Sequence, residues 1–196
     1  MMPPRPRDKR ARLIDAAVKL VHRQGFHRTT LAELAKDSHV PLGNVYYYFQ
    51  TKEALGDALI ERYVTEYAAV REQWEAAESD PAVRLGLLIQ MTIDQKDVLA
   101  RSGCPMGTLS SELHKEGGPL AEHMTELYAA LLDWTERQFR QLGQSRAEAH
   151  GCALHLLAAL EGARSLAYAF GEPKYAVQEA QRLREWVNEM RTAAKP

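Results

Sequence analysis

The sequence predicts an all-α fold of about nine helices. Apolar residues recur at spacings of three and four along most of the 196-residue chain, which is the period of a helix that buries one face. No segment alternates apolar and polar residues between turn signals, as a half-buried strand would. A hydrophobic content of 45% is sufficient for a buried core. These observations together favour packed helices without a sheet.

Start and stop signals set the bounds of the expected helices. Thr30 followed by Glu33 forms a capping box, which begins the second helix. Pro41 suits the first turn of the third helix, because the N–H that proline lacks would be unpaired there anyway. Gly25 suits the position just after a helix end. The expected helices cover residues 8–24, 30–38, 41–48, 51–75, 81–100, 108–116, 119–142, 145–170 and 174–190.

Three parts are expected along the chain. Residues 1–7 are rich in Pro and Arg and are expected to form a flexible basic arm. Residues 8–53 form a small three-helix domain, and residues 54–196 form a larger helical domain. The helix that follows Thr51 is long enough to bridge the two domains.

Charge is distributed unevenly between the two ends of the chain. Residues 1–53 carry ten Lys and Arg against five Asp and Glu, and residues 54–196 carry fifteen against twenty-one. A basic segment confined to one end fits a site for a polyanion such as nucleic acid. The alternative is a set of solvated charged faces, which is the more common use of such residues.

Signals for several other protein classes are absent from the sequence. No segment resembles a secretory signal, and no apolar run reaches the roughly 18 residues of a membrane span. Cys104 and Cys152 lie far apart with no second pair nearby, which argues against a zinc site and a disulfide framework. We therefore expect a cytoplasmic protein that has no membrane span, cofactor or metal.

The second and third helices have the pattern of a helix-turn-helix that reads DNA. The third helix is only about two turns long, and at about 100° per residue its side chains divide between two faces. Leu42, Val45 and Phe49 are expected to pack against the domain. The residues expected on the opposite, DNA-reading face are Gly43, Asn44, Tyr47 and Tyr48.

The chemistry of these residues suits DNA. Asn44 can pair with an adenine edge or a phosphate, and Gly43 lets the backbone approach closely. Lys52 and Thr30 each lie near a helix N-terminus, which favours phosphate. Aromatic clusters are more often core than binding surface. Three adjacent tyrosines on so short a helix point in three directions, however, so at least one faces solvent or a partner.

The segment from Ile14 to Leu55 resembles the TetR/AcrR (tetracycline-repressor) family of transcriptional regulators. The features that carry the resemblance are Gly25-Phe26, Thr30, Leu34-Ala35, Val40, Gly43, Tyr46-Tyr47, Phe49 and Lys52-Glu53-Ala54-Leu55. The resemblance implies a repressor dimer that binds palindromic operator DNA through residues 8–53. It also implies that residues 54–196 dimerise and bind a small effector.

The same resemblance implies roles for individual residues. It assigns phosphate contacts to Thr30 and Lys52. It assigns base or phosphate contacts to Pro41, Leu42, Gly43, Asn44, Tyr46, Tyr47 and Tyr48. Two positions depart from the family pattern, since Leu42 stands where a polar residue is common and Tyr48 where histidine is common.

An effector pocket is expected between helices of the C-terminal domain. The residues expected to line it are Leu87, Met91, Asp94, Met106, Leu109, Leu113, Met124, Tyr128, Leu131, Trp134 and His155. Each is also explained as ordinary core, apart from the polar handles Asp94 and His155. The set has no dominant charge, which favours a neutral or weakly polar organic effector.

The helix that begins at Ser145 is rich in small residues, which allow close approach between helices. With the last helix it can form a four-helix dimer interface across a two-fold axis. The alternative is close packing within one subunit. The sequence leaves both open.

Cys104 is a candidate redox sensor. It lies in a Gly/Pro turn just before a helix and near Arg101, where the helix field can lower the pKa of a thiol. The stretch GCPMGTLSSEL resembles an element found in a subset of the family, some members of which respond to electrophiles or oxidants. The alternative for Cys104 is a small buried hydrophobe, which is also our interpretation of Cys152.

Two other functions are open alternatives. A cysteine-dependent enzyme would pair Cys104 with a base such as His114 or His123, but nothing in their spacing supports it, and no catalytic residue is expected. A helical protein-interaction module would use the tyrosine cluster to bind protein. Phosphate-driven binding weakens steeply with salt, so salt dependence separates a DNA-binding protein from an interaction module.

Overall fold

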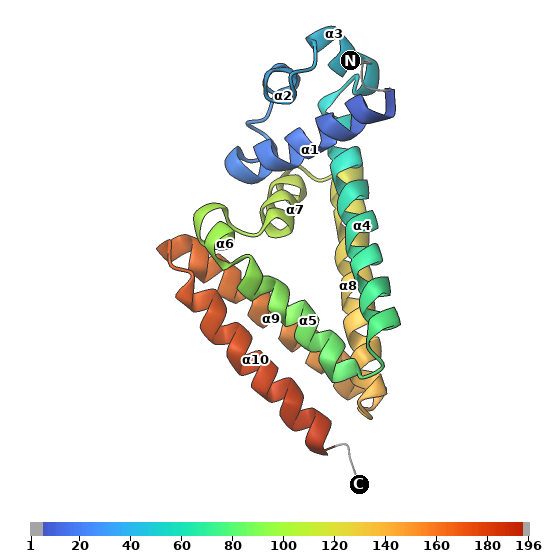
Figure 1. The fold of residues 1–196 in the computed structure, drawn as a ribbon, viewed down its shortest axis with the longest axis vertical. Coiled ribbons are helices and arrows are strands. Elements are labelled where there is room, and N and C mark those ends of the chain that lie inside the picture. Colours follow the sequence, from blue (N-terminus) through green and yellow to red (C-terminus); the bar gives the residue numbers. More distant parts are fainter. Residues whose placement is uncertain (1–5, 194–196) are drawn as a thin grey trace. The chain divides into compact units, whose positions relative to one another are not determined.

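The computed structural model describes residues 6–193, and all of their regular secondary structure is α-helical (Figure 1). The all-α prediction is therefore confirmed for this part of the chain. The helices are α1 (Pro6–Gln24), α2 (Leu31–Ser38), α3 (Leu42–Tyr48), α4 (Lys52–Ala77), α5 (Pro81–Asp94), α6 (Lys96–Ser102), α7 (Pro105–Glu116), α8 (Pro119–Gln141), α9 (Arg146–Phe170) and α10 (Lys174–Ala193).

The described residues form one more helix than expected. The helix expected over residues 81–100 is divided at Gln95, which has φ −98° and ψ 5° and is marked by neither Gly nor Pro in the sequence. α7 begins at Pro105, three residues before its expected start, because proline suits a first helical turn. α1 begins at Pro6, so the last two residues of the expected basic arm are helical, and residues 1–5 lie outside the described part.

Contacts group the chain into two units. The first contains the residues up to Glu66 together with Pro105–Leu127, and the second contains Tyr67–Cys104 together with the residues from Tyr128 onward. The first unit therefore combines α1, α2, α3 and the first half of α4 with α7 and the start of α8. The functional division at residue 53 stays a prediction, because contacts do not show which residues bind DNA or an effector.

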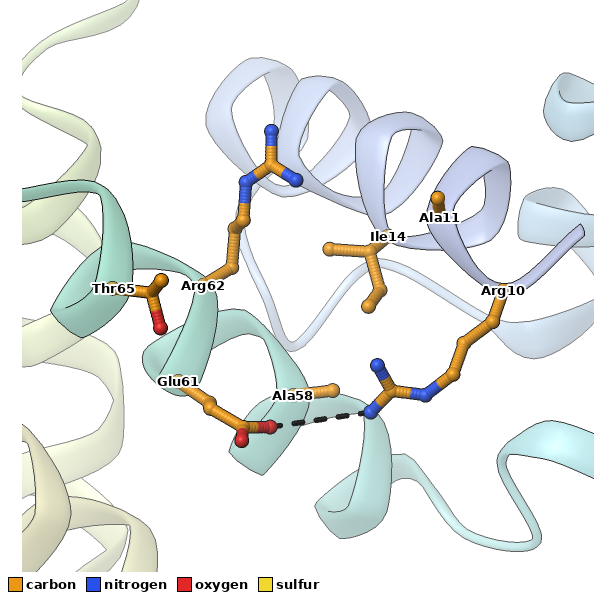
Figure 2. A pocket seen from close by; sticks show the side chains of 7 residues that line it. All are labelled: Arg10, Ala11, Ile14, Ala58, Glu61, Arg62 and Thr65. Atoms are coloured by element: carbon orange, nitrogen blue, oxygen red, sulfur yellow. Dashed lines mark ion pairs between the residues drawn. The ribbon is translucent and has the colours of Figure 1, made fainter. Parts of the chain in front are cut away.

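The first unit is held together by burial rather than by ion pairs. Its core includes the fully buried side chains of Leu13, Leu34, Leu55 and Leu59. Two ion pairs join α1 to α4, Arg10 to Glu61 at 4.0 Å and Asp15 to Arg62 at 3.4 Å. Arg10, Glu61 and Arg62 line an open cavity of about 370 Å³, and Figure 2 shows the pair of Arg10 and Glu61 beside it. Exposed pairs of this kind contribute about 0–1 kcal/mol each, so burial dominates.

The second unit has its core where α10 packs along α5 and α9 (Figure 1). The large side chains buried there include Leu85, Ile89, Trp134, Phe139, Leu156, Leu160 and Leu183. Trp134 keeps its polar atom satisfied, because its indole N–H donates to the carboxylate of Glu75 at 2.7 Å. The long helices of this unit are thus amphipathic elements that share one apolar core.

None of the described helices combines the length and the hydropathy needed to cross a membrane. Within residues 6–193, no three His, Cys, Asp or Glu side chains group in a way that could hold a metal ion.

Candidate functional site

The N-terminus of α2 has the capping box that the sequence predicts. The Thr30 hydroxyl accepts the Glu33 N–H at 3.1 Å, and the Glu33 carboxylate accepts the Thr30 N–H at 2.9 Å. The backbone hydrogen bond from Thr30, with help from its hydroxyl, lowers the pKa of Glu33 below its ordinary value. Thr30 is exposed at this helix end, and its hydroxyl also donates to the Glu33 carboxylate at 3.0 Å, so contact with a phosphate stays a prediction.

The turn between α2 and α3 directs the second helix of the pair. His39 takes a left-handed conformation with φ 54° and ψ 37°, which few non-glycine residues adopt. The N–H of Val40 bonds to the carbonyl of Ala35 at 3.1 Å, and the Val40 side chain is buried. The Arg12 guanidinium of α1 donates to the Ser38 carbonyl at 2.8 Å. The turn is therefore fixed from inside the helix pair and from α1.

α3 separates a packing face from an open face, with one correction to the prediction. Val45 and Phe49 are buried as expected, but Leu42, which was expected to pack beside them, is 40% exposed. Helical side chains tilt toward the N-terminus, so the side chain of the first helical residue leans past the helix end and away from the core. Leu42 is therefore open to solvent and does not pack with Val45 and Phe49 as expected.

The open face of α3 is aromatic and polar. Tyr47 is 80% exposed and its ring meets that of Tyr48 edge-on, with centroids 5.1 Å apart. Tyr46 is also exposed. A Cβ added to Gly43 would meet no atom within 4 Å, so a ligand can approach the backbone there. The tyrosine cluster is thus a surface feature and not core.

All nine predicted DNA-contact residues lie in the first unit, and none is buried. Six are exposed, namely Thr30, Pro41, Leu42, Gly43, Tyr46 and Tyr47, and three are half-buried, namely Asn44, Tyr48 and Lys52. The Lys52 ammonium donates to the His27 carbonyl at 2.6 Å and lies 5.0 Å from the centre of the Phe26 ring. DNA contact by these residues stays a prediction.

A polar cluster in the second unit surrounds Cys104. The Cys104 thiol donates to the Glu161 carboxylate at 3.5 Å, and Arg164 bonds to the same carboxylate at 2.6 Å. Two nitrogens of Arg164 also donate to the hydroxyl of Thr92, at 3.1 and 2.7 Å. Tyr128 lies close enough for Glu161 to affect its hydroxyl. Sequence reasoning singled out Cys104 and Tyr128 but missed the charged pair.

Burial and the neighbouring acidic groups oppose each other in their effect on the pKa of Arg164 and act together on the pKa of Tyr128. Burial by itself would lower the pKa of Arg164, but the neighbouring Cys104 and Glu161 offset it and raise that pKa. Burial raises the pKa of Tyr128, and the charge of Glu161 raises it further, so its hydroxyl stays protonated. The cluster therefore holds a cation, an anion and a hydroxyl donor beside a thiol. A charged pair within an Ala- and Leu-rich helix was the sequence signal that could have revealed it.

The predicted effector residues fall in both units. Met106, Leu109, Leu113 and Met124 are buried in the first unit. Leu87, Met91, Asp94, Tyr128, Leu131, Trp134 and His155 lie in the second. Of the two polar handles, Asp94 is exposed and accepts a hydrogen bond from Gln90, and the exposed His155 meets the ring of Trp186 at 4.9 Å. The effector pocket stays a prediction.

The histidines of the enzyme alternative have other partners. His114 lies within hydrogen-bond distance of Ser110 and Thr125, and His123 lies 3.2 Å from Asp57. Both histidines belong to the first unit and Cys104 to the second. A cysteine–histidine catalytic pair gains no support from these contacts.

Two models of regulatory proteins match successive parts of the chain. Residues 13–59 match the bacterial regulatory proteins of the tetR family, and residues 81–174 match the C-terminal domain of LmrA/YxaF-like transcriptional regulators.

Curated relatives are also transcriptional regulators. The transcriptional regulator AcuR of Cereibacter sphaeroides is 32% identical over 141 residues, which cover 71% of this chain and 62% of AcuR. The transcriptional repressor NemR of Escherichia coli is 32% identical over 118 residues, which cover 60% of this chain and 58% of NemR. The chain thus spans less than two thirds of these two relatives. The regulator LmrA of Bacillus subtilis is 29% identical over 79% of this chain and 84% of LmrA.

Solved structures share the fold. The regulatory protein TetR from Rhodobacter sphaeroides superposes with a TM-score of 0.78 at 23% identity, over 90% of this chain and 97% of that protein. The reduced form of Escherichia coli NemR superposes with a TM-score of 0.72 at 22% identity, over 90% and 95% of the two chains. Because its residues 13–59 match the tetR family and its residues 81–174 match the C-terminal domain of LmrA/YxaF-like regulators, the chain belongs to the TetR family of bacterial transcriptional regulators.

Proposed function

We propose that the protein is a homodimeric, ligand-responsive repressor that binds a palindromic operator through α3. The observation that carries the proposal is the open face of α3, where Tyr47 is 80% exposed while Val45, on the opposite face, is fully buried. A short helix with exposed hydroxyl groups and an open glycine fits the major groove. The name of NemR, a transcriptional repressor, supports repression.

Dimerisation is proposed to use the outer surface of α9. Four large apolar side chains on this helix are about half exposed or more: Leu154, Leu166, Tyr168 and Phe170. Gly151 and Gly162 are exposed on the same helix, with open space where a Cβ would lie. Apolar side chains beside such gaps suit a second copy of the same helix. Two half-sites read together give a dimer the affinity that one α3 lacks.

The effector is proposed to act on the C-terminal half of the chain. A small organic molecule bound among the predicted pocket residues is the general case. A thiol-reactive oxidant or electrophile is the specific case, because Cys104 is only half-buried and lies beside Glu161 and Arg164. The repressor NemR, which has been described in a reduced form, is consistent with redox chemistry in a relative.

The proposed function is tested by DNA selection followed by titration. The full-length protein is used to select its operator from random duplexes, and affinity is then measured by fluorescence anisotropy at several salt concentrations. We expect a palindromic operator, bound by a dimer, with an affinity that falls steeply as salt rises. Failure to enrich any sequence, or binding insensitive to salt, contradicts the proposal and favours the interaction module.

The sensor role of Cys104 is tested with N-ethylmaleimide, whose activated double bond adds to a thiol. We expect it to release the wild-type protein from the selected operator. Cys104→Ser should bind with unchanged affinity and resist release, whereas Cys152→Ser, the matched control, should behave as wild type. If the reagent also released the Cys104→Ser variant from the operator, Cys104 would have a structural role only.

A further inference from the structure

The carboxylate of Glu112, on α7, binds the turn between α1 and α2. One of its oxygens accepts the Phe26 N–H at 3.1 Å, and the other accepts the His27 N–H at 2.8 Å. All three residues belong to the first unit. Hydrogen bonds to an ionised acceptor are stronger than those between neutral groups, so this contact fixes the turn firmly.

Gly25, just before the turn, leaves room for this carboxylate because it has no side chain. Gly25 has φ +88°, a conformation that favours glycine, and a Cβ there would lie 2.7 Å from Oε1 of Glu112. The His27 ring adds contacts to the same helix, with Nδ1 3.1 Å from a carboxylate oxygen of Glu116 and Nε2 3.4 Å from the Glu112 carbonyl. α7 therefore holds the turn through both backbone and side chain.

α4 and α8 pack closely around the same turn. The Phe26 side chain is buried, and a Cβ on Gly56 of α4 would lie 3.0 Å from its ring and 2.8 Å from Leu120 of α8. This close packing limits movement of the turn relative to α4. A displacement of α7 that moves the turn must therefore also shift the first turns of α4.

The α1–α2 turn also binds the ammonium group of Lys52. The His27 carbonyl accepts one N–H of Lys52 at 2.6 Å. An ammonium group has three N–H donors, so two are left for a phosphate. A lysine side chain is flexible, and this hydrogen bond selects one direction for its charge.

We propose that Glu112 is a positioning residue, through which α7 sets the α1–α2 turn and so aims the Lys52 ammonium at a DNA phosphate. The inference rests on the proposed DNA-binding function. α7 begins directly after Cys104 in the chain, and Glu112 lies about two helical turns further on. Withdrawal of α7 removes the carboxylate from the turn and frees Lys52, which weakens operator binding.

The test compares Glu112→Ala with Glu116→Gln in the full-length protein. The control removes the Glu116 charge that faces the His27 ring but leaves both backbone N–H contacts with Glu112 intact, so it separates the side-chain contact from the backbone contacts that carry the proposal. From the size of charged hydrogen bonds, we expect Glu112→Ala to raise the dissociation constant for the selected operator about tenfold. The slope of log affinity against log salt should fall by about one unit, because one phosphate contact is lost. The control should stay within about twofold of wild type.

A double-mutant cycle with Lys52→Ala shows whether Glu112 acts through Lys52. If it does, adding Glu112→Ala to the Lys52→Ala protein should cost less than about twofold. Amide hydrogen exchange should accelerate at Phe26 and His27 in Glu112→Ala but not in Glu116→Gln. A merely stabilising role would make the two substitutions additive and leave the salt slope unchanged.

The outcomes separate this inference from the function on which it rests. A wild-type protein that binds no DNA overturns the proposed function and this inference together. Normal operator binding by wild type and by Glu112→Ala overturns the inference alone. Equal losses in Glu112→Ala and Glu116→Gln also overturn it, because the backbone contacts would then carry no special role.

Discussion

The helices α3 and α9 present opposite chemistry to solvent. α3 has seven residues and exposes tyrosine hydroxyl groups, while it buries the apolar Val45. α9 has 25 residues and exposes apolar side chains such as Phe170, while it turns the charged pair Glu161 and Arg164 toward Cys104. A polar open face suits DNA, and an apolar open face suits another protein surface. The difference supports the proposals that α3 reads the operator and that α9 joins two copies, while α9 also carries the charged pair near the thiol.

The largest expected effect comes from the open face of α9. Replacing both Leu166 and Phe170 by Glu places charges in the proposed dimer interface, and we expect monomers at micromolar concentration by light scattering. Loss of the second half-site should lower operator affinity about 100-fold or more. Asp133→Ala, an exposed change on α8, is the control. A charged variant that stays dimeric would move the interface away from this face of α9.

The local features of this comparison could be predicted from sequence, whereas the long-range ones could not. The capping box of Thr30 and Glu33 spans three positions and was confirmed, as were the approximate bounds of most helices. Arg164 meets Thr92 across 72 positions, and Glu112 meets Phe26 across 86. No periodic pattern connects residues so far apart, because such pairing depends on how whole helices pack. The predicted face of Leu42 failed for a related reason, since periodicity ignores where a helix begins.

The next largest effect should come from the inner face of α9. Arg164→Met leaves the carboxylate of Glu161 in a half-buried site without its cation. Fully buried pairs cost roughly 3–5 kcal/mol when one partner is removed. Because Glu161 keeps some exposure, we expect the free energy of unfolding to fall by about 2 kcal/mol in urea titrations.

Adding Glu161→Gln to Arg164→Met should recover part of this loss, since the uncompensated charge is then removed. No change in stability in the single variant would show that solvent already screens the pair.

Substitutions on α3 and at the start of α4 should separate the residues that discriminate between DNA sequences from the residue that contacts phosphate. Asn44→Ala or Tyr47→Phe should cost roughly 1–3 kcal/mol on the selected operator, with little change in salt slope, if a base contact is lost. Lys52→Ala should weaken binding to operator and scrambled DNA about equally and reduce the salt slope by about one unit. Titrations of each variant against both duplexes give both quantities.

None of these three changes should lower the free energy of unfolding as much as Arg164→Met does. The reason is that Tyr47 is exposed, Asn44 and Lys52 are only half-buried, and the hydrogen bond of Lys52 is exposed to solvent. Normal operator binding by the Asn44 and Tyr47 variants would show that α3 is not the reading helix.

The smallest expected effect is shared by α2 and α9, which both begin with a capping box. Hydrogen bonds from Thr30 hold the pKa of Glu33 below its ordinary value of 4.5, and those from Ser145, its side chain first, do the same for Glu148. A carboxyl group whose pKa is lower in the folded state adds stability above its unfolded pKa and loses it as pH falls through the folded value. Unfolding temperatures of wild type and Glu148→Gln should therefore differ at pH 7, and the difference should shrink as pH falls below the ordinary value of 4.5. Glu33→Gln should show the same convergence, because both carboxylates are exposed and owe their low pKa to cap hydrogen bonds and not to burial. A difference that does not shrink as pH falls would mean that the carboxylates stabilise these helices through packing of their stems and not through charge.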